Sequence, residues 1–65
     1  MAKPLPTAEA LFFEGTQRLT AGDAAGAESC LRQAIALAPT LAEAHANLGL
    51  ALEARGALAE AADCY

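Results

Sequence analysis

The segment that decides the fold is residues 42–65, AEAHANLGLALEARGALAEAADCY, because it repeats the preceding part of the chain at one fixed offset, with position i matching position i+34. Self-similarity at a constant period of this size is typical of proteins built from stacked structural repeats. The offset places residues 8–10 on 42–44, Gly15 on Gly49, Gly22 on Gly56, Ala27 on Ala61 and Cys30 on Cys64.

The composition indicates one small unit made of closely packed helices. The chain has 65 residues. A domain this short buries only about 60% of the surface that its unfolded form exposes. Hydrophobic residues make up 55% of the chain but aromatic residues only 5%, and much of the apolar content is alanine. Alanine favours helix strongly and contributes little buried area, so we expect helices that approach one another closely around a modest core.

The charge argues against nucleic acid as a partner. Eight acidic and four basic residues give a formal net charge of −4, whereas a nucleic-acid-binding surface needs a basic stripe. The first six residues carry a positive charge without the apolar run of a secretory signal, and no apolar run approaches the ~20 residues that span a bilayer. We therefore expect a cytoplasmic protein without a membrane partner, with a basic or neutral peptide mildly favoured.

The first half of the chain predicts a helical hairpin after an extended or disordered lead-in over residues 1–7. A first helix is expected from Ala8 to Thr20, with the Thr7 hydroxyl as its N-cap. The segment 21–23 then supplies a left-handed stop and a new cap. A second helix is expected from Ala24 to Leu37, where the following proline ends it.

The second half predicts another hairpin, cut off before it is complete. Residues 40–43, TLAE, match a capping box and predict a third helix from about Leu41 to Ala54. The segment 55–57 is expected to close it, and a fourth helix is expected to begin near Leu58. Connections of about three residues make neighbouring helices antiparallel.

These features resemble the tetratricopeptide repeat family, a 34-residue helix-turn-helix unit with a recurring pattern of small, aromatic and proline positions. Two positions depart from the pattern by being charged, Glu14 and Arg18, which are spaced to pair with each other. His45 and Leu52 replace the family's tryptophan and tyrosine. The matching residues are Gly15, Ala27 and Pro39 in the first unit and Leu48, Gly49, Ala61 and Tyr65 in the second.

The resemblance implies an all-α fold of stacked antiparallel helical hairpins, with one repeat over residues 8–41 and a truncated one over 42–65. Each unit's glycine would let its two helices approach closely, so Gly49→Leu is expected to unfold the second hairpin. The family binds peptides or partner helices on the concave face lined by the first helix of each unit. By position, those residues are Glu9, Phe12, Phe13, Thr16, Leu19, Glu43, Ala46, Asn47, Leu50 and Glu53.

Within that set, Asn47 is the best candidate for contact with a peptide, because an amide can bond both backbone N–H and C=O groups. The alternative is a solvated helix residue. Phe12 and Leu19 lie about 70° away from the face that the family pattern buries. They either pack in a core or leave an apolar strip for a ligand or a second copy.

An enzymatic site is not expected. His45 is the only histidine and is interpreted as a packing substitute for the tryptophan. With Cys30 and Cys64 it lacks the paired spacing of a zinc site, and no cofactor motif is present. The two cysteines, one period apart, are interpreted as reduced small core residues because stacked equivalents lie too far apart to bridge.

The sequence thus predicts a protein-protein interaction scaffold that binds a protein or peptide. Because repeat stacks need about three units, we also expect self-association into a homo-oligomer through uncovered helix faces, by docking or by exchanging helices. The alternative is the substrate-recruiting N-terminal repeat region of a larger enzyme, such as an O-GlcNAc-type glycosyltransferase. A structural oligomer without a ligand is a third possibility.

Overall fold

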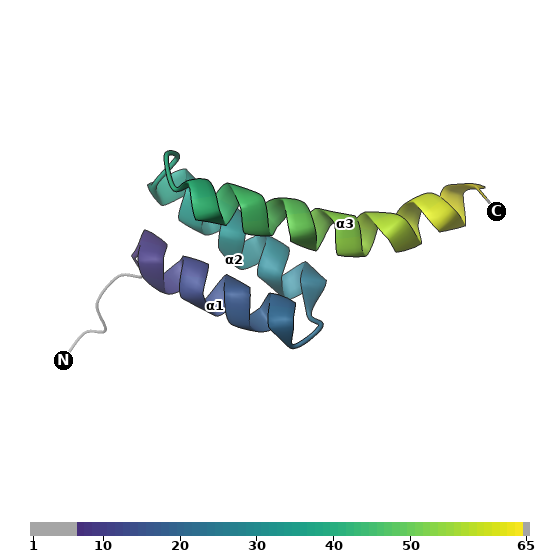
Figure 1. Ribbon diagram of the computed structural model, residues 1–65, viewed down its shortest axis with the longest axis horizontal. Helices are drawn as coiled ribbons and strands as arrows, with labels where there is room; N and C mark the ends of the chain where they lie inside the picture. The colour runs from purple at the N-terminus through teal and green to yellow at the C-terminus, as the bar shows by residue number, and fades with distance from the viewer. Residues whose placement is uncertain (1–6, 65) are drawn as a thin grey trace.

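The computed structural model describes the backbone of residues 7–64 and the side chains of residues 7–56. This part of the chain forms three α-helices and no strand, which confirms the all-α prediction. They are α1 (Ala8–Thr20), α2 (Ala24–Leu37) and α3 (Ala42–Cys64) (Figure 1).

The first two helices have the predicted bounds because local signals fix each end. Thr7 Oγ1 accepts a hydrogen bond from the Ala10 N–H (3.0 Å) and caps α1. Gly22 adopts a φ of 88°, a left-handed conformation that glycine allows without strain. Asp23 then caps α2 by accepting from the Gly26 N–H (2.9 Å).

The entry to α3 differs from the predicted capping box. Leu41 occupies the N-cap position, since its carbonyl accepts from the Ala44 and His45 N–H groups (3.0 and 3.3 Å), and the helix begins one residue later than expected. Neither Thr40 nor Glu43 makes a side-chain hydrogen bond within the described residues. The His45 ring instead bonds the Pro39 carbonyl (Nε2···O 2.8 Å), which ties the loop to the first turn of α3.

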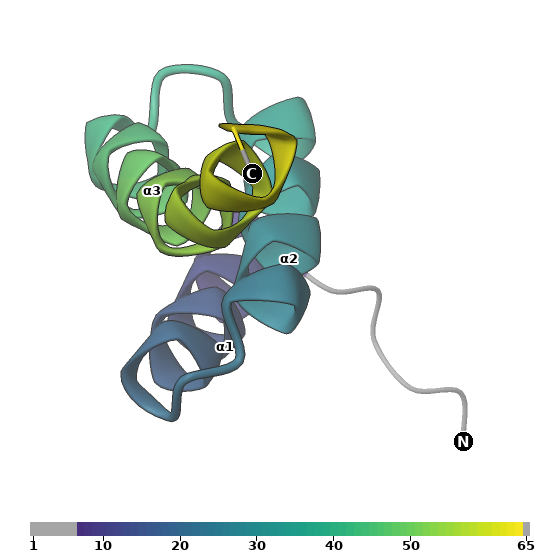
Figure 2. The same cartoon turned by 90° about the vertical axis from the view of Figure 1, so that its right-hand side faces the viewer.

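The helices pack as an antiparallel series. α2 runs antiparallel to α1, and α3 runs antiparallel to α2 and parallel to α1 (Figure 1). Viewed along the helices, α2 lies against both neighbours (Figure 2). One hairpin with a third helix stacked on it is therefore present. Two complete stacked hairpins do not form within residues 7–64.

The core is small and rich in alanine. Among the side chains of residues 7–56, Leu31 is the largest that is fully buried. Where α1 packs on α2, a Cβ added to Gly15 would lie 2.8 Å from Leu31 Cγ, so any larger residue there would displace the Leu31 side chain. Around this contact the buried cluster comprises Leu11, Ala27, Leu31, Ala34, Ala44 and Ala51, with Phe12, Leu19, Ile35, Leu41 and Leu48 packed against it.

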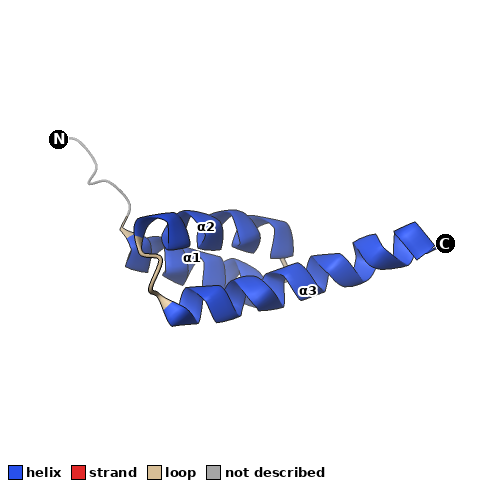
Figure 3. Ribbon diagram, turned by 90° about the horizontal axis from the view of Figure 1, so that it is seen from above, coloured by secondary structure: helices blue, strands red, loops and turns tan. Residues whose placement is uncertain are grey.

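The predicted turn at residues 55–57 and the separate fourth helix are wrong, because α3 continues without a break to Cys64. Its C-terminal part extends beyond the ends of α1 and α2 (Figure 3). Ala57 stands where the first unit has the capping Asp23, and losing a cap costs about 1 kcal/mol. Keeping Gly56 inside a continuous helix costs about the same. The two costs balance, so Gly56 alone does not favour the turn over the helix.

The absence of the second hairpin also changes the role of Gly49. A Cβ built on Gly49 meets nothing within 4 Å. The predicted unfolding of a second hairpin by Gly49→Leu therefore has no basis in this fold, since no second helix of that unit packs on the glycine.

Candidate protein-binding surface

The predicted binding residues lie on α1 and α3. Among the described residues, one side-chain hydrogen bond joins these two helices. The Asn47 Nδ2 group donates to Thr16 Oγ1 (3.0 Å), and the Thr16 hydroxyl donates to the Phe12 carbonyl (2.9 Å). Both contacts are partly buried. They fix the orientation of the Asn47 amide between the two parallel helices.

Asn47 keeps hydrogen-bonding capacity for a ligand. A side-chain amide offers two donor hydrogens and one carbonyl acceptor, and the bond to Thr16 uses one donor. The remaining N–H and the carbonyl oxygen can pair with the C=O and N–H groups of an extended peptide. Asn47 is half-buried and bonded to Thr16, so it is not a fully solvated helix residue.

Two large apolar side chains lie exposed within one helical turn of this contact. Phe13 is 63% exposed and Leu50 is 53% exposed. Ala46 is also exposed, and so are the three acidic members of the predicted set, Glu9, Glu43 and Glu53. The surface formed by Phe13, Thr16, Asn47 and Leu50 is called the α1/α3 surface below.

The remaining two residues of the predicted set, Phe12 and Leu19, face inward. Both are partly buried and pack against the core. Burial within the chain is therefore the alternative that holds, because α1 packs against both α2 and the added α3.

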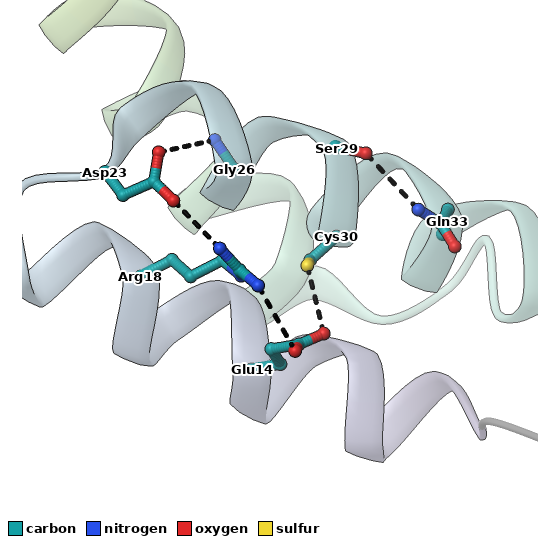
Figure 4. A network of polar contacts seen from close by, with 7 residues as sticks. All are labelled: Glu14, Arg18, Asp23, Gly26, Ser29, Cys30 and Gln33. Carbon is teal, nitrogen blue, oxygen red and sulfur yellow. Dashed lines mark hydrogen bonds and ion pairs between the residues drawn. The ribbon is translucent and has the colours of Figure 1, made fainter.

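A polar cluster lies where α1 faces α2 (Figure 4). Arg18 pairs with Glu14 (3.6 Å), as the spacing predicts, and with Asp23 (2.9 Å). The hydrogen bond from the Gly26 N–H and the Arg18 guanidinium lower the pKa of Asp23. The Cys30 thiol donates to Glu14 Oε2 (3.2 Å).

This cluster gives the two charged departures from the repeat pattern a structural role. The hydrogen bond to Asp23 is the main cause of the raised pKa of Arg18. Burial, followed by the bond to Glu14, raises the pKa of the Cys30 thiol, which favours the unreactive protonated form. Cys30 is a free, buried cysteine as predicted, and the prediction for Cys64 falls on a side chain outside the described residues.

A second ionic contact, missed by sequence reasoning, ties α3 to α2. Arg55 pairs with Glu28 (2.6 Å), and Glu28 also pairs with Arg32 (3.0 Å). The hydrogen bonds from Arg32 and Arg55 lower the pKa of Glu28. The i,i+4 spacing of Glu28 and Arg32 was visible in the sequence, whereas the partner on α3 required the helix packing.

His45 does not replace a buried tryptophan. Its side chain is exposed and bonds the Pro39 carbonyl, because the helix that would cover it is absent. Within the described residues, no three histidine, cysteine or acidic side chains cluster in a way that could hold a metal ion. None of the helices described is both long and apolar enough to cross a membrane.

Comparisons of the chain with family models, with curated proteins and with solved structures find no match. The proposed function therefore depends on the internal repeat and on the contacts of the α1/α3 surface.

Proposed function

We propose that this chain is a protein-interaction module of the tetratricopeptide repeat kind, which binds an extended peptide or a partner helix on the α1/α3 surface. The observation that carries the proposal is the Thr16–Asn47 contact. It holds an amide one helical turn in sequence from Leu50, and its partner Thr16 lies one turn from Phe13; both apolar side chains are exposed. A few fixed polar groups among apolar contacts are typical of ligand sites.

The charges around the α1/α3 surface favour a basic partner. Glu9, Glu43 and Glu53 are exposed on the same two helices, and the chain carries a net charge of −4. Complementary charge raises the association rate and excludes acidic competitors more than it raises affinity. The expected ligand has an apolar anchor for Phe13 and Leu50, flanked by lysine or arginine.

The test is a synthetic peptide library that varies apolar anchors and flanking charge, screened by fluorescence anisotropy. For the best binder, Asn47→Ala and Phe13→Ala should each raise Kd by about tenfold, the effect of losing ~1.4 kcal/mol. Leu37→Ala is the matched control, because Leu37 on α2 is 59% exposed and lies outside the surface. Equal effects of all three variants, or no binder in the library, would refute the proposal.

We further propose that the module self-associates through an uncovered face of α3. Leu52 is 40% exposed, and α3 projects beyond the hairpin (Figure 3). Leu52 lies on the same face as the exposed His45 and Gly49, and a helix face without a partner offers a site for association. Light scattering over a micromolar concentration series should show a shift from monomer to dimer, and a monomer throughout would overturn self-association.

A further inference from the structure

Two glycines at equivalent positions of the internal repeat have different surroundings. Gly15 is buried under α2, where an added Cβ would lie 2.8 Å from Leu31 Cγ and 3.3 Å from Cys30 Cβ. Gly49, its equivalent one repeat later, is exposed, and an added Cβ would meet nothing within 4 Å. The second unit therefore has the same small residue without the helix that makes it necessary in the first.

The sequence that covers the glycine in the first unit is itself repeated. Cys30 and Leu31 of α2 lie against Gly15, and Ala27 is buried one turn earlier on the same helix. At the offset that relates the two glycines, their equivalents are Ala61, Cys64 and Tyr65. The chain thus contains a second copy of the covering segment, matched in order and spacing to the second glycine.

That segment cannot cover Gly49 of its own chain while α3 is continuous. With a rise of about 1.5 Å per residue, Cys64 lies about 22 Å along the helix axis from Gly49. The face that it would cover is exposed: His45, Gly49 and Leu52 recur at i, i+4 and i+7, the spacing of one helical face, and all three are accessible.

We propose that residues 58–65 of a second copy of this chain pack on the His45, Gly49 and Leu52 face, and that the exchange is reciprocal. Each chain then supplies to the other the segment that residues 24–31 supply within the first unit. In a dimer with twofold symmetry the same two surfaces meet twice, so the exposed face of each chain is covered by the segment of the other. The proposal rests on the self-association proposed above and specifies its contact.

Blocking the glycine is the first test. Gly49→Leu adds bulk to this face at an exposed position, where an added Cβ meets nothing within 4 Å. It should raise the dimer Kd measured by light scattering by about tenfold or more, with the helical circular dichroism of the monomer retained. Ala54→Leu is the matched control, at an exposed position of α3 that is ~140° away from Gly49 at ~100° per residue. Equal dimerisation of both variants would overturn the proposal.

Cross-linking tests which segment occupies the face. In the first unit the equivalent Cβ–Cβ distance is 3.3 Å, close to the range of about 3.5–4.5 Å in disulfides. Mild oxidation of the Gly49→Cys variant should therefore link that thiol to Cys64 of another chain, seen as a covalent dimer and mapped by mass spectrometry after digestion. Ala54→Cys should give no such link.

The outcomes separate exchange from simple association. A dimer in light scattering without the link to Cys64 leaves self-association standing and overturns exchange. The same link formed within one chain also overturns it, because the segment then folds back. Adding Ala57→Asp to the Gly49→Cys variant restores the cap that Asp23 provides in the first unit. The disulfide should then form within a chain instead of between chains. If it still forms only between chains, the continuity of α3 is not what prevents the segment from covering its own Gly49.

Discussion

The two glycines of the repeat allow one substitution to be compared in two environments. Gly15→Ala and Gly49→Ala each place alanine in the interior of a helix, which favours folding by about 1 kcal/mol. The built Cβ of Gly15 lies 2.8 and 3.0 Å from two atoms of the buried Leu31 side chain, and that of Gly49 has no neighbour within 4 Å. The helix-propensity term cancels between the variants, so their difference isolates the packing of α1 on α2.

The magnitude follows from these distances. Overpacking of a filled core costs about 1–3 kcal/mol, so Gly15→Ala should change the free energy of unfolding by between about 0 and 2 kcal/mol in the destabilising direction. Gly49→Ala should stabilise by up to about 1 kcal/mol. In a domain of this size each kcal/mol corresponds to about 4–8 °C in Tm.

The assay is urea and thermal unfolding followed by circular dichroism in the far ultraviolet, at a concentration where light scattering shows monomer. Working below the dimer Kd removes any contribution from a partner on the Gly49 face. If both variants raise the stability by the same amount, Leu31 does not pack against Gly15 as described, and the account of the core is wrong.

Other predictions concern caps, pH and the buried thiol. Thr7→Ala should lower the free energy of unfolding by about 1 kcal/mol, whereas Thr40→Ala should leave it nearly unchanged, as urea unfolding would show. The pKa values of Asp23 and Glu28 are lowered in the folded chain, so their contribution to stability is present above the ordinary values of 3.8 and 4.5. This contribution is lost as the pH falls through the lowered pKa values. The midpoint of urea unfolding, measured from neutral to acidic pH, should show this decline. Burial raises the pKa of the Cys30 thiol, so Cys30 should react with a thiol reagent about tenfold or more slowly in the folded chain than in urea.

The first hairpin could be predicted to the residue because each of its boundaries has a local cause. A hydroxyl cap at Thr7, a left-handed glycine at Gly22 and a carboxylate cap at Asp23 act within three or four residues of the backbone that they fix. Pro39 acts on its immediate neighbour in the same way. Such signals operate whatever the rest of the chain does.

The second unit could not be predicted in this way because its outcome depends on packing at a distance. Gly56 repeats Gly22, but Ala57 lacks the acceptor of Asp23, so the choice between turn and helix is left to what the following segment contacts. Arg55, which was predicted to lie in the turn, is instead helical and pairs with Glu28 of α2. A repeat in sequence therefore did not ensure a repeat in conformation.

The candidate surface was predictable in outline only. The period of the repeat predicts that Asn47 and Leu50 lie on the side of α3 that binds a ligand. The bond from Asn47 to Thr16, however, depends on the spacing of α1 and α3. The inward position of Phe12 depends on the same spacing. Residue periodicity gives a face for each helix, and only the packing decides which faces meet.

The two proposed contacts lie on different sides of α3. Asn47 and Gly49 are two residues apart, which separates their directions by about 160° at about 100° per residue. A peptide on the α1/α3 surface and a second chain on the Gly49 face therefore do not compete for space. An exchanged dimer carries two peptide-binding surfaces, and a partner with two matching motifs gains affinity through effective concentration when its linker spans them. Self-association would then strengthen partner binding, whereas the Gly49→Leu variant would retain the affinity for a single motif and lose that gain.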